Sequence, residues 1–186
     1  MREGWEIKKL GEVCNLYQPK TISSEMLDIN GKYLVYGANG VIGRYNKYNH
    51  EESEVLLTCR GATCGSINIS TPFAWINGNA MVVKPVDVNV VERYFLKYYL
   101  CSVDWSQVIT GAAQPQITRQ TLSPLSIPVP PLAEQEKIVE ELDCLSGIIE
   151  KKKEQLKQLD ALAQSIFYEM FGNPIDNEKG WEFHRI

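Results

Sequence analysis

The stretch Ile127–Val139, IPVPPLAEQEKIV, divides the chain into two parts of different composition. Three prolines in four positions end the preceding structure, because proline lacks a backbone N–H donor and fixes its own φ. Pro131 suits the first turn of a new helix, where Glu134 and Glu136 interact favourably with the helix dipole. The next 40 residues contain no proline and a single glycine. A helix over residues 131–171 is therefore predicted.

This predicted helix carries an apolar seam whose steps alternate between four and three residues. Such spacing over more than four heptads predicts a coiled coil. About 40 residues with a rise of 1.5 Å each span roughly 60 Å, more than the width of a domain of this size. The chain offers no second helix of this kind, so the partner must be another copy, another protein or a further part of the same protein. Lys152 interrupts the seam, either to fix its register or to extend to its edge. The predicted interface residues are Ile138, Leu142, Leu145, Ile149, Leu156, Leu159, Ile166 and Met170.

The part before the prolines has a different texture, rich in Gly, Asn, Thr, Val and Tyr. Short runs with the β-branched and aromatic content of strands lie at residues 32–37, 54–59, 65–70 and 79–86. Residues 90–102 have the periodicity of an amphipathic helix. The predicted fold class is α+β: a globular mixed α/β domain with short strands, followed by a long helix in an antiparallel coiled coil. The predicted divisions are a domain at 1–130, the helix at 131–171, and a linker with further sequence at 172–186.

The composition is that of a globular protein, with 44% hydrophobic and 23% charged residues and a net charge of −4. No run of 18 apolar residues exists, and the N-terminus lacks the apolar core of a signal peptide, so we expect a cytoplasmic protein without a membrane span. The five cysteines are expected to be free thiols. The spacing of Cys59 and Cys64, without a second pair, gives only a weak zinc signal, and no metal site is predicted.

The charges are distributed unevenly along the chain. Residues 1–128 carry 12 basic and 11 acidic groups, whereas residues 129–186 carry 7 basic and 12 acidic groups. Three windows, 29–50, 55–86 and 105–133, contain no acid at all. A surface built from these windows would be locally positive, as a nucleic-acid-binding surface requires, although chance also leaves gaps in any distribution of acids. The basic residues in these windows are Lys32, Arg44, Lys47, Arg60, Lys84 and Arg119.

One of these windows contains YLVYGANGVIGRY (residues 33–45), which looks like a dinucleotide-binding fingerprint. A dinucleotide site needs a helix directly after the glycines, so that the helix N-terminus meets the pyrophosphate. Here RYNKYNHEESE follows, with poor helix propensity, and the next apolar run begins too soon for a helix and a returning strand. We therefore reject a nicotinamide enzyme and expect the glycines to form tight turns between short strands.

No other catalytic constellation emerges from the sequence. A Ser–His or Cys–His pair would depend on His50, which is expected to be a solvated loop residue. The chain is predicted to have no enzymatic activity and no cofactor of its own.

The ends of the chain show a weak internal repeat. Residues 4–10 read GWEIKKL and residues 180–186 read GWEFHRI. This similarity suggests either a two-repeat parent protein or one unit whose end joins a neighbour.

Five segments together resemble the DNA specificity subunit of type I restriction–modification systems, over nearly the whole chain. They are GWEIKKLGEV (4–13), YGANGVIGRY (36–45), LLTCRGATCG (56–65), GAAQPQITRQTLSPLSIPVPPLAEQEKIV (111–139) and FYEMFGNPIDNEKGWEF (167–183). In that family each repeat has a target recognition domain and a conserved helix, and two such helices pair antiparallel as a spacer. Each domain reads one half of a split target in double-stranded DNA.

The resemblance also implies partners. In the family, modification subunits clasp the spacer and methylate adenine with S-adenosylmethionine, so this cofactor is expected on the partner. Whether a restriction subunit joins is left open. Without a second repeat, we expect this chain to form a homodimer through residues 132–171. The competing hypothesis is a coiled-coil adaptor that binds only proteins.

Base readout uses Arg or Lys for guanine and Asn or Gln for adenine. Any one of the candidates could instead be structural: Thr118 could cap a short turn, and Asn77 or Asn79 could shape a hairpin. The candidate DNA-binding residues lie in turn-rich, acid-free segments: Asn39, Arg44, Tyr45, Lys47, Arg60, Thr63, Asn77, Asn79, Gln114, Gln116 and Arg119.

Overall fold

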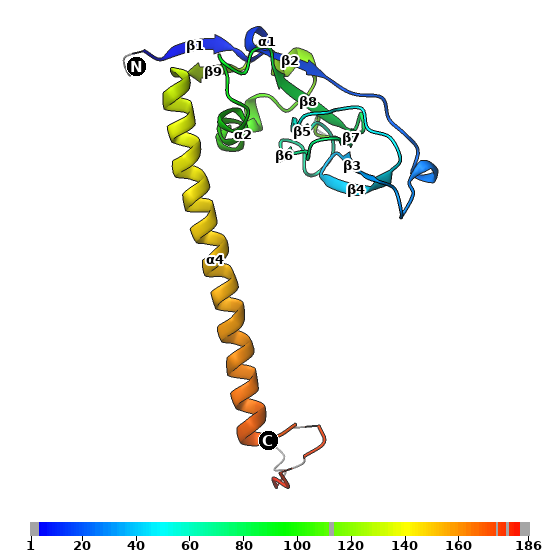
Figure 1. Ribbon diagram of the computed structural model, residues 1–186, viewed down its shortest axis with the longest axis vertical. Coiled ribbons are helices and arrows are strands. Elements are labelled where there is room, and N and C mark those ends of the chain that lie inside the picture. The colour runs from blue at the N-terminus through cyan, green and yellow to red at the C-terminus, as the bar shows by residue number, and fades with distance from the viewer. Residues whose placement is uncertain (1–3, 112–113, 174, 178, 183–186) are drawn as a thin grey trace. The chain divides into compact units, whose positions relative to one another are not determined.

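The computed structural model describes residues 4–111, 114–173, 175–177 and 179–182 (Figure 1). The chain divides into two compact units, Met1–Val139 and Glu140–Ile186, each considered by itself. The elements in chain order are β1 (Glu6–Lys9), α1 (Leu10–Val13), β2 (Cys14–Tyr17), the 3₁₀ helix η1 (Ser24–Met26), β3 (Tyr33–Gly37), β4 (Gly40–Tyr45), β5 (Val55–Thr58), β6 (Ile67–Ile69), β7 (Trp75–Ile76), β8 (Ala80–Pro85), α2 (Arg93–Ser102), the 3₁₀ helix η2 (Trp105–Gln107), α3 (Arg119–Leu122), β9 (Ser126–Val129) and α4 (Leu132–Phe171).

The strands of the first unit form three small sheets. The largest has the order β2-β8-β5-β6, a second has the order β4-β3-β7, and β1 pairs with β9. All neighbours are antiparallel except β3 and β7, which run parallel. The four predicted strands correspond to β3, β5, β6 and β8, and the predicted helix at 90–102 corresponds to α2. The mixed α+β fold class is therefore confirmed.

The two central strands of the four-stranded sheet, β5 and β8, contribute to a core on each face of the sheet. They can do so because successive side chains of a strand point to opposite faces. Leu57 of β5 and Val83 of β8 belong to a large core that also contains Leu96 and Leu100 of α2. Leu56 points to the opposite face, into a smaller core with residues of β3 and β7. The apolar runs Val55–Leu57 of β5 and Ala80–Val83 of β8 follow from this double burial.

The glycines after β3 form a hairpin, as predicted. Gly37 pairs with Gly40 across the β3–β4 turn, and Gly40 has φ of +108°, a conformation that side chains disfavour. The chain then continues as the edge strand β4, and no helix follows. The structural context of a dinucleotide site is therefore missing.

The start of α4 is anchored in the domain by Gln135, which is fully buried. Its Nε2 donates to the carbonyls of Val90 and Pro130, both at 2.8 Å, and its Oε1 accepts from the backbone N–H of Glu92 at 2.8 Å. Because of this anchor, the first compact unit extends to Val139, beyond the expected boundary at residue 130. The helix itself begins one residue later than expected, at Leu132.

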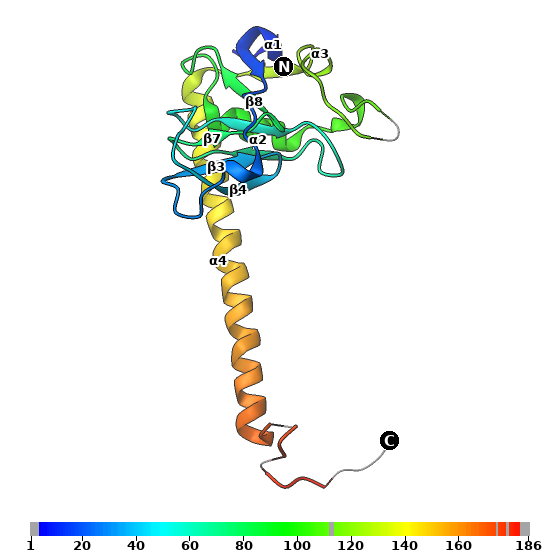
Figure 2. The same ribbon diagram turned by 90° about the vertical axis from the view of Figure 1, so that its right-hand side faces the viewer.

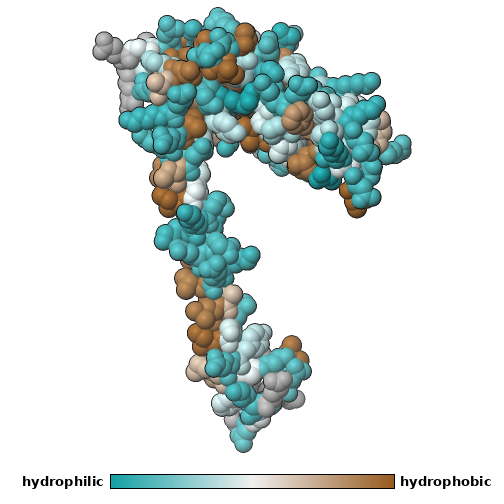
Figure 3. Space-filling model, in the orientation of Figure 1, coloured by the Kyte–Doolittle hydropathy of each residue, from teal (hydrophilic) through white to brown (hydrophobic). Residues whose placement is uncertain are grey.

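The second unit consists mainly of α4, whose apolar seam lies exposed in the single chain. Figure 3 shows apolar groups along α4 on both sides of a hydrophilic stretch. The sequence of α4 has a polar stretch at its three lysines, 151–153. Within this stretch Lys152 donates to Gln155 of the same helix at 3.1 Å. The exposed fractions are 55% for Leu145, 53% for Ile149, 63% for Leu156, 60% for Leu159, 46% for Ile166 and 60% for Met170.

Gly172 ends α4 with φ of +72°, and its N–H donates to the carbonyl of Tyr168 at 2.8 Å. The two copies of the GWE motif have different contacts. The indole N–H of Trp5 donates to the carboxylate of Glu134, whereas that of Trp181 donates to the carbonyl of Phe171. The last residues of the second copy, 183–186, lie outside the described part of the chain.

Candidate nucleic-acid interface

A cleft of about 420 Å³ opens where the end of β2 meets two loops from distant parts of the sequence. It combines the loop after β5 with the segment that leads into α3, so two of the three acid-free windows contribute to one surface. Neither Asp nor Glu is among its lining residues. The cleft is lined by Leu16, Tyr17, Gln18, Arg60, Met81, Gln116, Ile117, Thr118 and Arg119.

Backbone hydrogen bonds join the two loops. The N–H of Ile117 donates to the carbonyl of Cys59 at 3.0 Å, and that of Gly61 donates to Pro115 at 3.1 Å. Arg60 and Gln116 form an antiparallel bridge between these bonds. The two side chains are therefore held beside each other by main-chain pairing, which leaves their polar groups available for a ligand.

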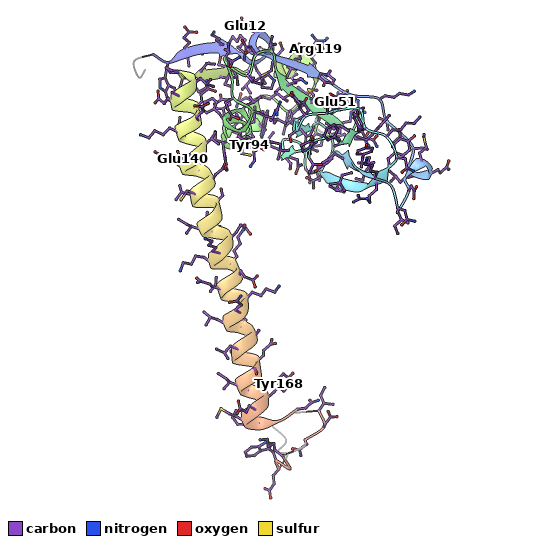
Figure 4. All side chains as sticks on the ribbon, in the orientation of Figure 1. Glu12, Glu51, Tyr94, Arg119, Glu140 and Tyr168 are labelled. Atoms are coloured by element: carbon purple, nitrogen blue, oxygen red, sulfur yellow. The ribbon has the colours of Figure 1, made fainter. Side chains whose placement is uncertain are left out.

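Two arginines of the cleft present free guanidinium groups. Arg60 and Arg119 are exposed, and neither side chain has a hydrogen-bond or ion-pair partner among the described residues. Arg119 is the first residue of α3, which Thr118 caps by accepting from the N–H of Thr121 at 3.2 Å (Figure 4 labels Arg119). By contrast, the guanidinium of Arg44 donates to the carbonyls of Gly31 and Lys32, so Arg44 secures the turn before β3.

The cleft includes an amide side chain that the sequence did not single out, that of Gln18. Its Nε2 donates to Cys59 Sγ at 3.1 Å and to the carbonyl of Gly78 at 3.0 Å, which fixes the amide at the edge of the cleft. The only sequence signal was an amide between a strand and a proline, in LYQPK. That signal is too common in proteins to identify a binding residue.

The other candidates divide between the cleft and the second sheet. Exposed Thr63 and Gln114 belong to the same two loops as the cleft, and Asn79 is exposed beside β8. The remaining candidates, Asn39, Arg44, Tyr45 and Lys47, lie on or beside β4. Tyr45 packs edge-on against Trp75, with ring centroids 5.4 Å apart. The structure therefore brings together Arg60, Gln116 and Arg119 but does not bring the β4 residues to them.

Asn77 must be removed from the candidate DNA contacts. It is 3% exposed, and its Oδ1 accepts from the N–H of Ile22 at 3.0 Å and from the indole N–H of Trp75 at 3.1 Å. A buried amide with these partners joins two chain segments, and a base edge cannot reach it. The alternative, structural role for Asn77 is the one the contacts favour.

The expectation of a solvated His50 is also wrong. This histidine is half-buried, and its Nε2 lies 2.9 Å from the hydroxyl of Tyr17. Its Nδ1 lies 2.7 Å from Oδ1 of Asn49, which also accepts from the N–H of Ile76. The ring therefore donates from Nδ1 and accepts at Nε2 from Tyr17. Burial, with a smaller effect of Lys84, lowers the pKa of His50.

The cysteines and the potential metal ligands can be checked over the described residues. All five cysteines are free, and burial raises the pKa of Cys14 to about 12, so its thiol is unreactive. Over the described residues, no group of three or more His, Cys, Asp or Glu side chains could hold a metal ion. Nor does any helix in this part of the chain have the length and apolar character to cross a membrane.

The chain thus combines a mixed α+β domain, with two arginines in an acid-free cleft, and a long helix with an exposed apolar seam. The model of one family, the type I restriction modification DNA specificity domain, matches residues 2–160. The chain belongs to this family.

Two curated relatives illustrate the match. The type I restriction enzyme MjaIX specificity subunit of Methanocaldococcus jannaschii is 30% identical over 219 residues, covering 98% of this chain and 50% of the relative. The EcoDI specificity subunit of Escherichia coli is 26% identical, covering 83% of this chain and 34% of the relative. The chain thus spans half or less of the length of these relatives.

Solved structures show the same fold. The S subunit of a type I restriction–modification system from M. genitalium has a TM-score of 0.67 at 17% identity, with 95% of this chain and 48% of that chain covered. A chain from a structure of type I R-M complex assembly has a TM-score of 0.70 at 24% identity, with 89% and 44% covered. A mixed domain followed by a long helix is therefore a fold that solved structures already contain.

Proposed function

We propose that this chain reads one half of a bipartite DNA target as a non-catalytic specificity subunit of a type I restriction–modification complex. The observation that carries the proposal is the cleft, which is lined by two amides and by two guanidinium groups that have no partner among the described residues, with no acid in the lining. Arginine donates in pairs to guanine, and glutamine can bond adenine in the same way, so this set of groups suits the major groove.

The catalytic groups would reside on partner subunits. The family assignment supports modification subunits that methylate adenine, with S-adenosylmethionine bound there and not on this chain. A restriction subunit is a further candidate partner. A complex that acts on the cell's own DNA belongs in the bacterial or archaeal cytoplasm.

The long helix would set the distance between two reading domains. Its exposed seam requires a partner helix, since leucine and isoleucine side chains gain about 25 cal/mol for each Å² removed from water. The relatives are at least twice as long as the matched region, so they have room for a second domain and helix. In this chain, a second copy would supply both, through an antiparallel homodimer of α4.

The test is selection from a randomised duplex library, with the modification subunit present, followed by sequencing of the bound fraction. We expect a short motif that occurs twice at a fixed spacing. Complex formation without any enriched motif would overturn the proposal and favour the adaptor hypothesis. An adaptor would also show little loss of DNA binding with added salt, whereas each phosphate contact contributes to a steep salt dependence.

A further inference from the structure

A second cavity has a volume of about 560 Å³. Tyr17 lines both this cavity and the cleft. Lys84 of β8 and Glu54, just before β5, contribute to its lining, together with His50 and Trp75. Its volume falls in the range of ligand sites. None of these side chains was among the candidate DNA contacts.

The cavity contains an ion pair whose carboxylate is buried. Glu54 is fully buried, and its Oε1 accepts from Nζ of Lys84 at 2.8 Å, while its Oε2 has no partner among the described residues. The Lys84 side chain is 40% exposed. An ammonium group has three donors, and the bond to Glu54 uses one, so Lys84 keeps donors for a ligand.

The buried carboxylate is expensive for a purely structural role. Removing a carboxylate from water costs several kcal/mol, and apolar residues of similar size often stabilise a fold as well or better. The hydrogen bond to Glu54 is the main cause of a raised pKa of Lys84, so the amine is charged. The charged amine of Lys84 is therefore held in place at the cavity by Glu54.

The wall of the cavity is also fixed. The hydroxyl of Tyr17 donates to His50, and His50 donates to Asn49. Asn49 in turn bonds both the N–H and the carbonyl of Ile76, at 2.8 and 3.0 Å. A chain of hydrogen bonds therefore runs from the cavity wall to β7, which keeps the site in one shape.

The charges around the cavity indicate which part of DNA could enter. Glu51 and Glu52 line it as well, so its carboxylates outnumber Lys20 and Lys84 and disfavour a phosphate (Figure 4 labels Glu51). An uncharged base edge with acceptors meets less repulsion than a phosphate does, and its acceptors can bond Lys84 directly. Guanine O6 and N7 are the acceptors that lysine bonds in the major groove.

We propose that this cavity is a second base-reading subsite, in which Lys84 donates to O6 or N7 of a guanine in the half-site. Glu54 is a positioning residue that holds the amine at the cavity. This inference rests on the proposed DNA-reading function and extends it from the cleft to the second cavity.

The test compares the motifs that variants of the full chain select from the duplex library. Lys84→Met alone would leave a buried carboxylate unpaired and could unfold the domain, so the main variant is Glu54→Leu with Lys84→Met, which removes both charges. We expect it to lose the preference for guanine at one position, on the order of tenfold, with the other positions unchanged. Lys84→Arg should retain this preference, and the control Lys137→Met, at an exposed position of α4 outside the cavity, should leave the motif intact.

Each contrary result has a separate meaning. If the double variant selects the wild-type motif, the subsite is overturned while the proposed function stands. A uniform loss of affinity with a smaller salt slope would also overturn it, because it marks a phosphate contact. Loss of modification-subunit binding with an unchanged motif would assign the cavity to a protein partner instead. If the wild-type chain selects no motif, the proposed function itself fails.

Discussion

The two units of this chain bury apolar side chains in different ways. In the domain, β5 and β8 are covered on both faces by elements of the same chain. Along α4 the apolar seam stays about half exposed from Leu145 to Met170. The domain therefore buries its apolar side chains within one chain, whereas the apolar seam of α4 needs a second helix to cover it. Under the proposed function, the domain would read DNA and the helix would set a distance (Figure 2 shows the same structure turned by 90°).

The largest expected effect is that of a charge placed on the apolar seam of α4, which should weaken the dimer. Leu156→Glu should raise the dissociation constant of the dimer at least a hundredfold, about 3 kcal/mol, because each dimer loses two buried leucines and gains two carboxylates. Gln158→Glu adds the same charge beside the seam and should leave the dimer intact. Light scattering at tens of micromolar measures both. A monomeric wild-type chain would refute the pairing of α4.

The next largest effect concerns the joint between the domain and the helix. Gln135→Leu should lower the free energy of unfolding by about 3 kcal/mol, because it leaves the Glu92 N–H and two carbonyls buried without partners. Its exposed neighbour provides the control, as Glu136→Gln should change little. Urea unfolding at one fixed protein concentration gives the comparison. If Gln135→Leu and Glu136→Gln had the same free energy of unfolding, Gln135 would not be an anchor of α4.

A smaller effect is expected in the cleft. Arg119→Ala should weaken specific DNA binding by about 2 kcal/mol, since the free guanidinium can bond guanine or phosphate directly. Lys137→Ala, which removes a charge from exposed α4, is the matched control. Titration of the selected duplex with the complete complex measures the change. Unchanged affinity would remove Arg119 from the reading surface without affecting the helix.

The smallest effect is the pH dependence of His50. Its folded-state pKa is lowered, so the unfolded chain binds a proton more readily, and stability is lost as the pH falls below the ordinary value of 6.5. The wild type should therefore lose part of its stability advantage over His50→Gln between about pH 7 and pH 5. Thermal unfolding of both proteins across this interval provides the data. An advantage that grows on acidification would show that His50 is stabilised as a cation.

Much of this architecture could be predicted from the sequence. The heptad seam and the prolines defined α4, and β-branched runs defined β3, β5, β6 and β8, because local periodicity reports burial. The short elements β1, β7 and β9 escaped prediction, since each is stabilised by a strand distant in sequence: β1 pairs with β9 across more than 100 residues.

The site was predictable only in part for the same reason. Acid-free windows indicated Arg60, Gln116 and Arg119, but their convergence depends on backbone bonds between two distant loops. Periodicity carries no information about such bonds. The burial of Asn77 and the pairing of Glu54 with Lys84 likewise depend on which segments meet in the fold.

The most direct test of the division between reading and spacing is to shorten α4 and repeat the selection. Deletion of residues 156–162 removes one heptad and keeps the seam in phase. It shortens each helix by about 10 Å, which corresponds to about three base pairs. We predict that the selected half-sites keep their sequence while the spacing between them decreases by about this amount. Half-sites that change sequence, or a spacing that does not change, would contradict the account.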